Sequence, residues 1–207
     1  MSDATSPFGQ ARYQVRLDWS VSGARRILPG AHVAVLVDAL LYTTHVVAAA
    51  EGGEDSPAAG VVAAMLDAEA SERGLVVLAA SLRNRAAVAD RVLALQEERG
   101  ERMIVAVLAA GEPADDGRGI RPAVEDQLTA GAVVDALVAL GIDHTSPEAA
   151  VASAAYEGLR HAAVHLIGAS ASGAELVAAG RKAEVRQATE RDVTRVVPEL
   201  REGVFRA

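Results

Sequence analysis

The sequence predicts a three-layer α/β/α fold in which helices cover both faces of a mainly parallel β-sheet. Short runs of β-branched and aliphatic residues alternate with longer amphipathic stretches that are rich in alanine. Strands that alternate with helices in this way are joined by βαβ crossovers, which make the strands parallel. Several of the amphipathic stretches end at glycine, the residue that most readily takes the left-handed conformation after a helix.

Four segments are predicted as strands of this sheet. Residues 13–18 alternate between apolar and polar side chains, which is typical of a short strand. Residues 33–37 form a continuous run of aliphatic side chains, the pattern of a strand buried on both faces. The same pattern recurs at residues 75–78 and 103–108, so these segments are expected to lie in the same sheet.

The stretches between and after these strands are predicted as helices and loops. Residues 51–57 and 111–122 are rich in Gly, Pro and Asp and are expected to be loops. Residues 186–207 mix polar and apolar side chains, which suits a segment folded back over the domain. Helices are expected at residues 44–50, 58–73, 85–99, 125–140, 147–162 and 172–179.

Length and composition limit the function. The 207 residues are 51% hydrophobic and include no cysteine, so one domain over residues 1–207 can bury a core without disulfides or zinc. The formal net charge is -8 and no basic block is present, which argues against a nucleic-acid partner. Residues 1–16 hold no apolar leader, so we expect a cytoplasmic protein. Asp38 lies within the most apolar stretch and would cost about 3 kcal/mol in a membrane, so we expect no membrane partner.

Polar residues at the ends of the predicted strands are the candidates for chemistry. Ligands of open α/β sheets bind beyond the carboxyl ends of the strands. Asp38 closes the strand at residues 33–37, and Thr43 and Thr44 follow where a helix begins. The unpaired N–H groups of a helix N-terminus bind phosphate, which makes both threonines candidate substrate ligands. The alternative is that they only cap the helix while Asp38 caps a turn.

Two further strand ends carry polar residues. Arg83 and Asn84 follow the strand at residues 75–78. The guanidinium and the amide could bind an anionic substrate, or Asn84 could only cap the next helix. Arg121, Glu125 and Asp126 follow the strand at residues 103–108. Acids at a helix start interact favourably with its dipole, but two carboxylates together with Asp38 also form the oxygen-ligand set that Mg²⁺ needs. The sequence contains no phosphate-binding glycine loop and no HExxH motif.

The order of these motifs resembles that of the 2-phosphosulfolactate phosphatase family, in particular its actinobacterial branch. The resemblance extends over nearly the whole chain, and only residues 54–74 stand where family members carry a longer insert. The matching stretches are YQVRLDW (13–19), VAVLVDALLYTT (33–44), VVLAASLRNRAAVAD (76–90), VAVLAAGE (105–112), IRPAVEDQLTAGAVVDAL (120–137) and ASGAELVAAGRKAEV (171–185).

The resemblance implies an α/β/α fold and Mg²⁺-dependent hydrolysis of a small phosphorylated acid that carries a sulfonate. It also assigns roles: Asp38, Glu125 and Asp126 as catalytic residues and Mg²⁺ ligands, and Thr43, Thr44 and Asn84 as substrate-binding residues. Arg83 and Arg121 are further candidate substrate-binding residues beside these motifs. The second hypothesis is a non-catalytic or substrate-shifted member that binds a small anion or acts as an assembly subunit. The alanine-rich face of residues 58–70 fits a homodimer interface and an ordinary core equally well.

Overall fold

A computed structural model describes residues 6–67, 74–114 and 119–207. In this part of the chain, a seven-stranded sheet has the order β1-β5-β2-β4-β8-β9-β3. The first four strands in this order are parallel, and all four were predicted, β1 from its alternating pattern and the other three from their aliphatic runs. Their bounds are β1 (Val15–Trp19), β5 (Val105–Ala109), β2 (Val33–Val37) and β4 (Val76–Ala80).

Three short antiparallel strands extend the sheet beyond β4. Strand β8 (Glu199–Arg201) pairs with β4 at Leu78 and continues as a hairpin into β9 (Val204–Arg206). Strand β9 in turn pairs with β3 (Ser56–Pro57). The segment after residue 186 therefore folds back over the domain as predicted, and it contributes strands that the sequence analysis did not assign.

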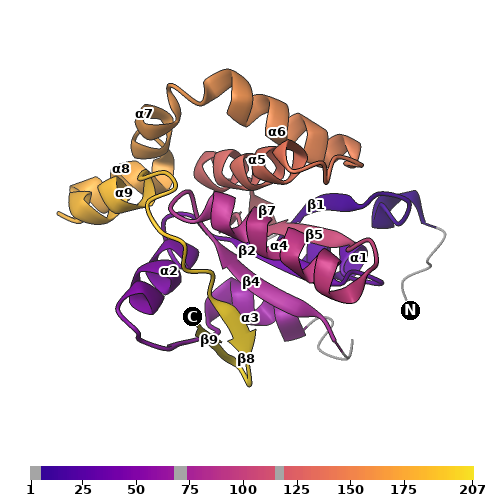
Figure 1. Cartoon of the computed structure of the whole chain (residues 1–207). Helices are drawn as coiled ribbons and strands as arrows, with labels where there is room; N and C mark the ends of the chain where they lie inside the picture. Colours follow the sequence, from indigo (N-terminus) through magenta and orange to yellow (C-terminus); the bar gives the residue numbers. More distant parts are fainter. Residues whose placement is uncertain (1–5, 68–73, 115–118) are drawn as a thin grey trace.

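Helices cover both faces of the sheet, which confirms the three-layer α/β/α prediction (Figure 1). Helices α4, α5 and α6 bury one face against alternate side chains of β2 and β5, such as Val35 and Val107. Helices α1, α2 and α3 bury the other face against Leu36 and Leu108. Their bounds are α1 (Ser20–Ile27), α2 (Thr43–Glu51), α3 (Gly60–Asp67), α4 (Arg85–Arg99), α5 (Val124–Ala139) and α6 (Pro147–Leu159).

Three short helices form a third apolar cluster at the edge where the parallel strands end. These helices are α7 (Ala163–Gly168), α8 (Ala171–Ala178) and α9 (Lys182–Ala188). They contribute Ile167, Leu176 and Val185, which pack with Leu40 and Leu82 from the segments that follow β2 and β4. The cluster lies beside α5, on the left in Figure 1.

Several helix predictions are corrected in their bounds. The helix expected over residues 147–162 ends at Leu159, and α7 begins separately at Ala163. The helix expected over residues 58–73 begins at Gly60, and residues 68–73 lie outside the described residues. The loop at residues 111–122 contains a two-strand ladder, β6 (Glu112–Pro113) with β7 (Ile120–Arg121), and residues 115–118 are not described.

The apolar stretch around Asp38 forms β2 and α2, as predicted, with Asp38 between them. No helix in the described ranges is both long and apolar enough to cross a membrane.

Helices α5 and α6 pack closely at Gly131. A Cβ atom added to Gly131 would lie 2.1 Å from the carbonyl oxygen of Ala152 and 3.1 Å from the Cβ atom of Tyr156. Only a residue without a side chain allows the two helix backbones to approach in this way. Gly131 therefore fixes how α6 lies over the sheet-covering helix α5.

Candidate functional site

A cleft of about 450 Å³ lies beyond the carboxyl ends of β1, β2 and β5. This is the edge at which parallel α/β sheets bind ligands. Polar residues line the cleft after each of these strands: Ser20 directly follows β1, Asp38 directly follows β2, and Glu112 lies three residues after the end of β5. The remaining walls are largely apolar and come from α2, α3 and the β6–β7 ladder, with Leu41, Tyr42, Ala59, Val61, Pro113 and Ile120 among their residues.

Asp38 is the acidic residue of the cleft that sequence analysis singled out. Its side chain is 7% exposed, and its Oδ1 atom accepts a hydrogen bond of 3.1 Å from the backbone N–H of Leu41. Burial, with a smaller contribution from the negative charges of Glu112 and Glu125, raises the pKa of Asp38 to about 6, although hydrogen bonds from backbone N–H groups act to lower it. Asp38 is therefore a carboxylate that can exchange a proton near neutral pH.

Asp126 joins the two loops that form the floor of the cleft. Its Oδ1 atom accepts from the N–H of Ala39 at 2.7 Å, and its Oδ2 atom accepts from the N–H of Gly111 at 2.9 Å. Burial and the neighbouring charge of Asp38 raise the pKa of Asp126 well above its ordinary value. Because Ala39 follows β2 and Gly111 follows β5, one carboxylate at the start of α5 positions both loops.

Glu125 and Glu112 meet at the hydroxyl of Ser172, which contacts both carboxylates. Arg121 forms an ion pair with Glu112 across the β6–β7 ladder. A serine hydroxyl has one proton to donate, so it satisfies only one of the two carboxylates. The Oε2 atom of Glu125 is buried and has no hydrogen-bond partner among the described residues. A buried carboxylate oxygen without a hydrogen-bond donor is a candidate ligand for a cation.

The hydroxyls of Thr43 and Thr44 bind the backbone around Asp38. The Thr43 Oγ1 atom donates to the carbonyl of Asp38 at 2.9 Å and accepts from its N–H at 3.0 Å. The Thr44 Oγ1 atom donates to the carbonyl of Ala39 at 2.6 Å. Both side chains are buried, and neither lines the cleft. They hold the β2–α2 loop in the shape that presents Asp38.

Arg83 and Asn84 lie away from the cleft. The Asn84 Oδ1 atom accepts from the N–H of Ser81 at 2.9 Å, and its Nδ2 atom donates to the carbonyl of Val196 at 3.0 Å. Arg83 forms ion pairs with Glu51 and with Glu190. Both residues thus fasten the segment before β8 to the end of β4.

Of the residues predicted from the sequence, the structure brings the acidic ones together. Asp38, Glu125 and Asp126 interact electrostatically, and Arg121 joins them through Glu112. Sequence analysis did not assign a role to Glu112, although it follows β5 almost as directly as Asp38 follows β2. Ser20 was also missed, and its left-handed backbone (φ 56°) at the end of β1 has no sequence signal.

No group of three or more His, Asp or Glu side chains in the described residues is arranged to hold a metal ion by itself. Mg²⁺ is usually held by one or two carboxylates, with substrate phosphate and water as the other ligands. The unpartnered Oε2 atom of Glu125 and the cleft carboxylate of Asp38 fit that mode of binding, whereas a closed cage of protein ligands does not fit.

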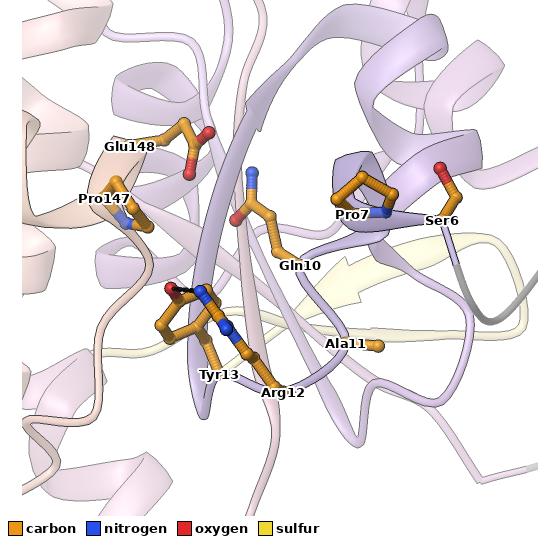
Figure 2. A pocket seen from close by; sticks show the side chains of 8 residues that line it. All are labelled: Ser6, Pro7, Gln10, Ala11, Arg12, Tyr13, Pro147 and Glu148. Carbon is orange, nitrogen blue, oxygen red and sulfur yellow. Dashed lines mark hydrogen bonds between the residues drawn. The ribbon is translucent and has the colours of Figure 1, made fainter.

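A second cavity of about 450 Å³ lies near the amino end of β1, between the N-terminal segment and the start of α6 (Figure 2). Its polar groups are largely engaged within the protein. The Arg12 Nη2 atom donates to the hydroxyl of Tyr13 at 2.7 Å. The amide of Gln10 binds the N–H and the carbonyl of Leu17, in the manner of a neighbouring strand. Glu148 is the single carboxylate among the described residues that line this cavity, so no carboxylates converge there as they do in the first cleft.

The protein is a three-layer α/β/α protein with a mainly parallel sheet, and its acidic side chains gather at a cleft beyond the strand ends. This is the place at which proteins of this class bind ligands. The sequence model of the 2-phosphosulpholactate phosphatase family matches residues 63–203, which is more than half of the chain. The chain belongs to this family of phosphatases. The matched region contains Glu112, Glu125 and Asp126, whereas Asp38 precedes it. A search of curated proteins gives no match.

Proposed function

We propose that the protein is a Mg²⁺-dependent phosphatase that releases phosphate from a small phosphorylated (sulfo)carboxylic acid bound in the cleft at Asp38. The observation that carries this proposal is a group of interacting carboxylates beside a cleft of about 450 Å³. Asp38 comes from the end of β2, Glu112 from the segment after β5, and Glu125 and Asp126 from the first turn of α5. Membership of a phosphatase family supports the class of reaction.

Asp38 and Glu125 are the residues that would hold Mg²⁺, because Asp38 lines the cleft and Glu125 has a buried oxygen without a partner. When bound, Mg²⁺ neutralises charge on the phosphoryl oxygens and positions the attacking water. Asp126 keeps its own place beside them by binding the N–H groups of Ala39 and Gly111. We assign it a positioning role as well as the ligand role inferred from the sequence.

Hydrolysis requires a group that accepts the proton of the attacking water while the bond between phosphorus and the ester oxygen breaks. We assign this role to Asp38, because it is a carboxylate that lines the cleft directly after β2. The leaving oxygen then takes a proton from solvent. Glu112 is held by Arg121 and Ser172, so we assign it to shaping the cleft rather than to proton transfer.

The decisive experiment measures phosphate release from a panel of phosphate monoesters, with and without Mg²⁺, by the wild type and by Asp38→Asn. We expect Mg²⁺-dependent release that falls by at least about a hundredfold in Asp38→Asn, the usual contribution of a general base. Asp90→Asn is the matched control, because Asp90 is exposed on α4 and forms an ion pair with the exposed Arg195. Release by Asp38→Asn at the wild-type rate would sink the assignment.

The alternative is a non-catalytic member that binds a small anion or serves as an assembly subunit. The observation that favours it is that Thr43, Thr44, Arg83 and Asn84 are engaged in internal contacts instead of facing the cleft. This alternative predicts no phosphate release, together with binding of inorganic phosphate in calorimetry. Sedimentation would test whether the protein is the homodimer proposed from the alanine-rich face.

We also propose that the protein acts in the cytoplasm on a small diffusing substrate, with no nucleic-acid or membrane partner. The net charge of -8 supports this proposal, because it opposes binding to polyanions.

A further inference from the structure

Ser20 directly follows β1 and lines the cleft at Asp38. The residue is 6% exposed, and none of the hydrogen bonds among the described residues engages its hydroxyl. Tyr42 is the other described lining residue with a hydroxyl, and this hydroxyl donates to the carbonyl of Pro57 at 2.6 Å. Ser20 therefore presents to the cleft a side-chain donor that the described part of the protein leaves unused.

The backbone of Ser20 favours a residue without a side chain. Its φ angle is 56°, in the left-handed region, where a Cβ atom crowds the backbone and glycine is the default residue. Glu202 has nearly the same angle (φ 55°), but it lies exposed in the turn between β8 and β9. Strained residues that persist in a binding site indicate a use for their side chain. The conformation of Ser20 therefore supports a function for its hydroxyl.

The strand register places Ser20 and Asp38 at the same level on the two sides of β5. Trp19 pairs with Ala109 on one side of β5, and Val37 pairs with Ala109 on the other side. Ser20 and Asp38 are the next residues along the chain, so two strand spacings separate their backbones, about 10 Å. The Ser20 hydroxyl is therefore across the cleft from the carboxylate that we assign to Mg²⁺.

A phosphorylated carboxylic acid fits this arrangement. In the proposed function the phosphoryl group lies at Asp38, so the group that reaches Ser20 is a second substituent of the ligand. A hydroxyl donates well to an anionic oxygen, because charge-assisted hydrogen bonds are about twice as strong as neutral ones. The carboxylate is the anionic substituent that all phosphorylated (sulfo)carboxylic acids share. Glu112, which follows β5 between the two groups, is ion-paired with Arg121, so its charge repels a carboxylate less.

We propose that Ser20 is a substrate-binding residue whose hydroxyl donates a hydrogen bond to the carboxylate of the phosphorylated acid, and that it selects esters which carry this group. The inference rests on the proposed function, and it assigns recognition of the substrate class to a residue of the same site. It follows from the unengaged hydroxyl, the left-handed backbone and the place of Ser20 across β5 from Asp38.

The test compares two phosphate esters that differ only in the carboxylate. These are 2-phospholactate and isopropyl phosphate, in which a methyl group replaces the carboxylate. Ser20→Ala should lower the ratio of kcat/KM for 2-phospholactate to that for isopropyl phosphate by at least about tenfold, the loss expected for a hydrogen bond to a charged group. An unchanged ratio, even with both rates lowered, would overturn the inference while the phosphatase proposal stands.

Substitution by glycine separates this role from a structural one. Ser20→Gly should lower the same ratio, yet its melting temperature should be about 2–4 °C above that of Ser20→Ala, because glycine relieves the left-handed backbone. Glu202→Gly and Glu202→Ala are the matched controls, since Glu202 does not line the cleft. They should differ by a similar shift and keep the wild-type ratio. The inference fails if Ser20→Gly keeps the wild-type ratio or melts below Ser20→Ala.

Binding measured in parallel separates this inference from the proposed function. Calorimetry with Mg²⁺ uses 2-(phosphonomethyl)propanoate and isobutylphosphonate, the methylene counterparts of the two esters, which are not hydrolysed. If neither ester is hydrolysed, the phosphatase proposal fails, and the phosphonates decide the inference. It is supported if the carboxylated phosphonate binds Ser20→Ala at least about tenfold more weakly than the wild type, with isobutylphosphonate unaffected. No binding of the carboxylated phosphonate, or an equal change for both, overturns it.

Discussion

Replacement of Asp38 by asparagine is expected to stabilise the protein at neutral pH while it removes activity. The Asp38 carboxylate is buried among other acids, and its pKa in the folded protein is about 6 against an ordinary value of 3.8. Asparagine has nearly the same shape, and its side-chain oxygen still accepts from the N–H of Leu41. The variant therefore keeps the hydrogen bond and loses the cost of the buried charge.

The sign and size of the effect follow from proton linkage. Between pH 4 and pH 6 the folded protein binds more protons at Asp38 than the unfolded chain does, so the free energy of unfolding falls as the pH rises through this range. A pKa difference of about 2 units corresponds to about 3 kcal/mol, which is reached in full above pH 7. At pH 5 the same relation gives about 1.5 kcal/mol. For a chain of this length, about 3 kcal/mol raises the melting temperature by roughly 7 °C.

The assay is urea unfolding of the wild type and of Asp38→Asn at several pH values from 5 to 8, in buffer with EDTA so that no divalent cation compensates the charge. We expect the variant to be more stable throughout, by a margin that roughly doubles from pH 5 to pH 8. Asp90→Asn serves as the control and should show no such margin, because Asp90 is exposed. A variant that is less stable than the wild type at pH 8, or a margin that does not change with pH, would refute the reasoning.

Two further predictions concern packing and the attachment of the segment before β8. Gly131→Ala should destabilise the protein by about 3 kcal/mol, because the new methyl group meets the carbonyl of Ala152, whereas Gly158→Ala, with open space around it, should stabilise α6 by up to about 1 kcal/mol. Urea unfolding of both variants checks this, and similar effects of the two would contradict it. Asn84→Ala should cost about 2–4 kcal/mol, because buried backbone groups, including the carbonyl of Val196, lose their partner. A loss below about 1 kcal/mol in the same assay would show that these groups find other partners.

The central sheet was predictable because its strands are buried on both faces. The aliphatic run at Val33–Val37 gives the bounds of β2 directly, since every residue of this strand is buried. The hairpin of β8 and β9 was not predictable from local pattern, because its three-residue strands depend on pairing with β4, which is remote in sequence. Helix α1 also escaped prediction, since it contains Gly23, whose place is set by contact with Asp18.

The candidate site was predictable in its position and less so in its contacts. Asp38 is predicted because it directly follows an aliphatic strand, and ligands of open α/β sheets bind beyond the carboxyl ends of the strands. This prediction needs only the order of residues along the chain. The partners of Arg83 are Glu51 and Glu190, which are 32 and 107 residues away in the sequence. Only tertiary structure shows that this guanidinium serves the fold instead of the cleft. The same holds for Thr43, whose hydroxyl turns back to the peptide of Asp38.

The two hydrogen bonds to the Asp126 carboxylate have a consequence for the motion of the loops at the cleft. The N–H groups of Ala39 and Gly111 belong to different loops, yet both are held by a side chain at the first turn of α5. Exchange of either amide hydrogen with solvent requires that this shared acceptor be released. The two amides should therefore exchange slowly and at matching rates in deuterated water, although they lie in loops. Their exchange would report the opening of the floor of the cleft as a single event.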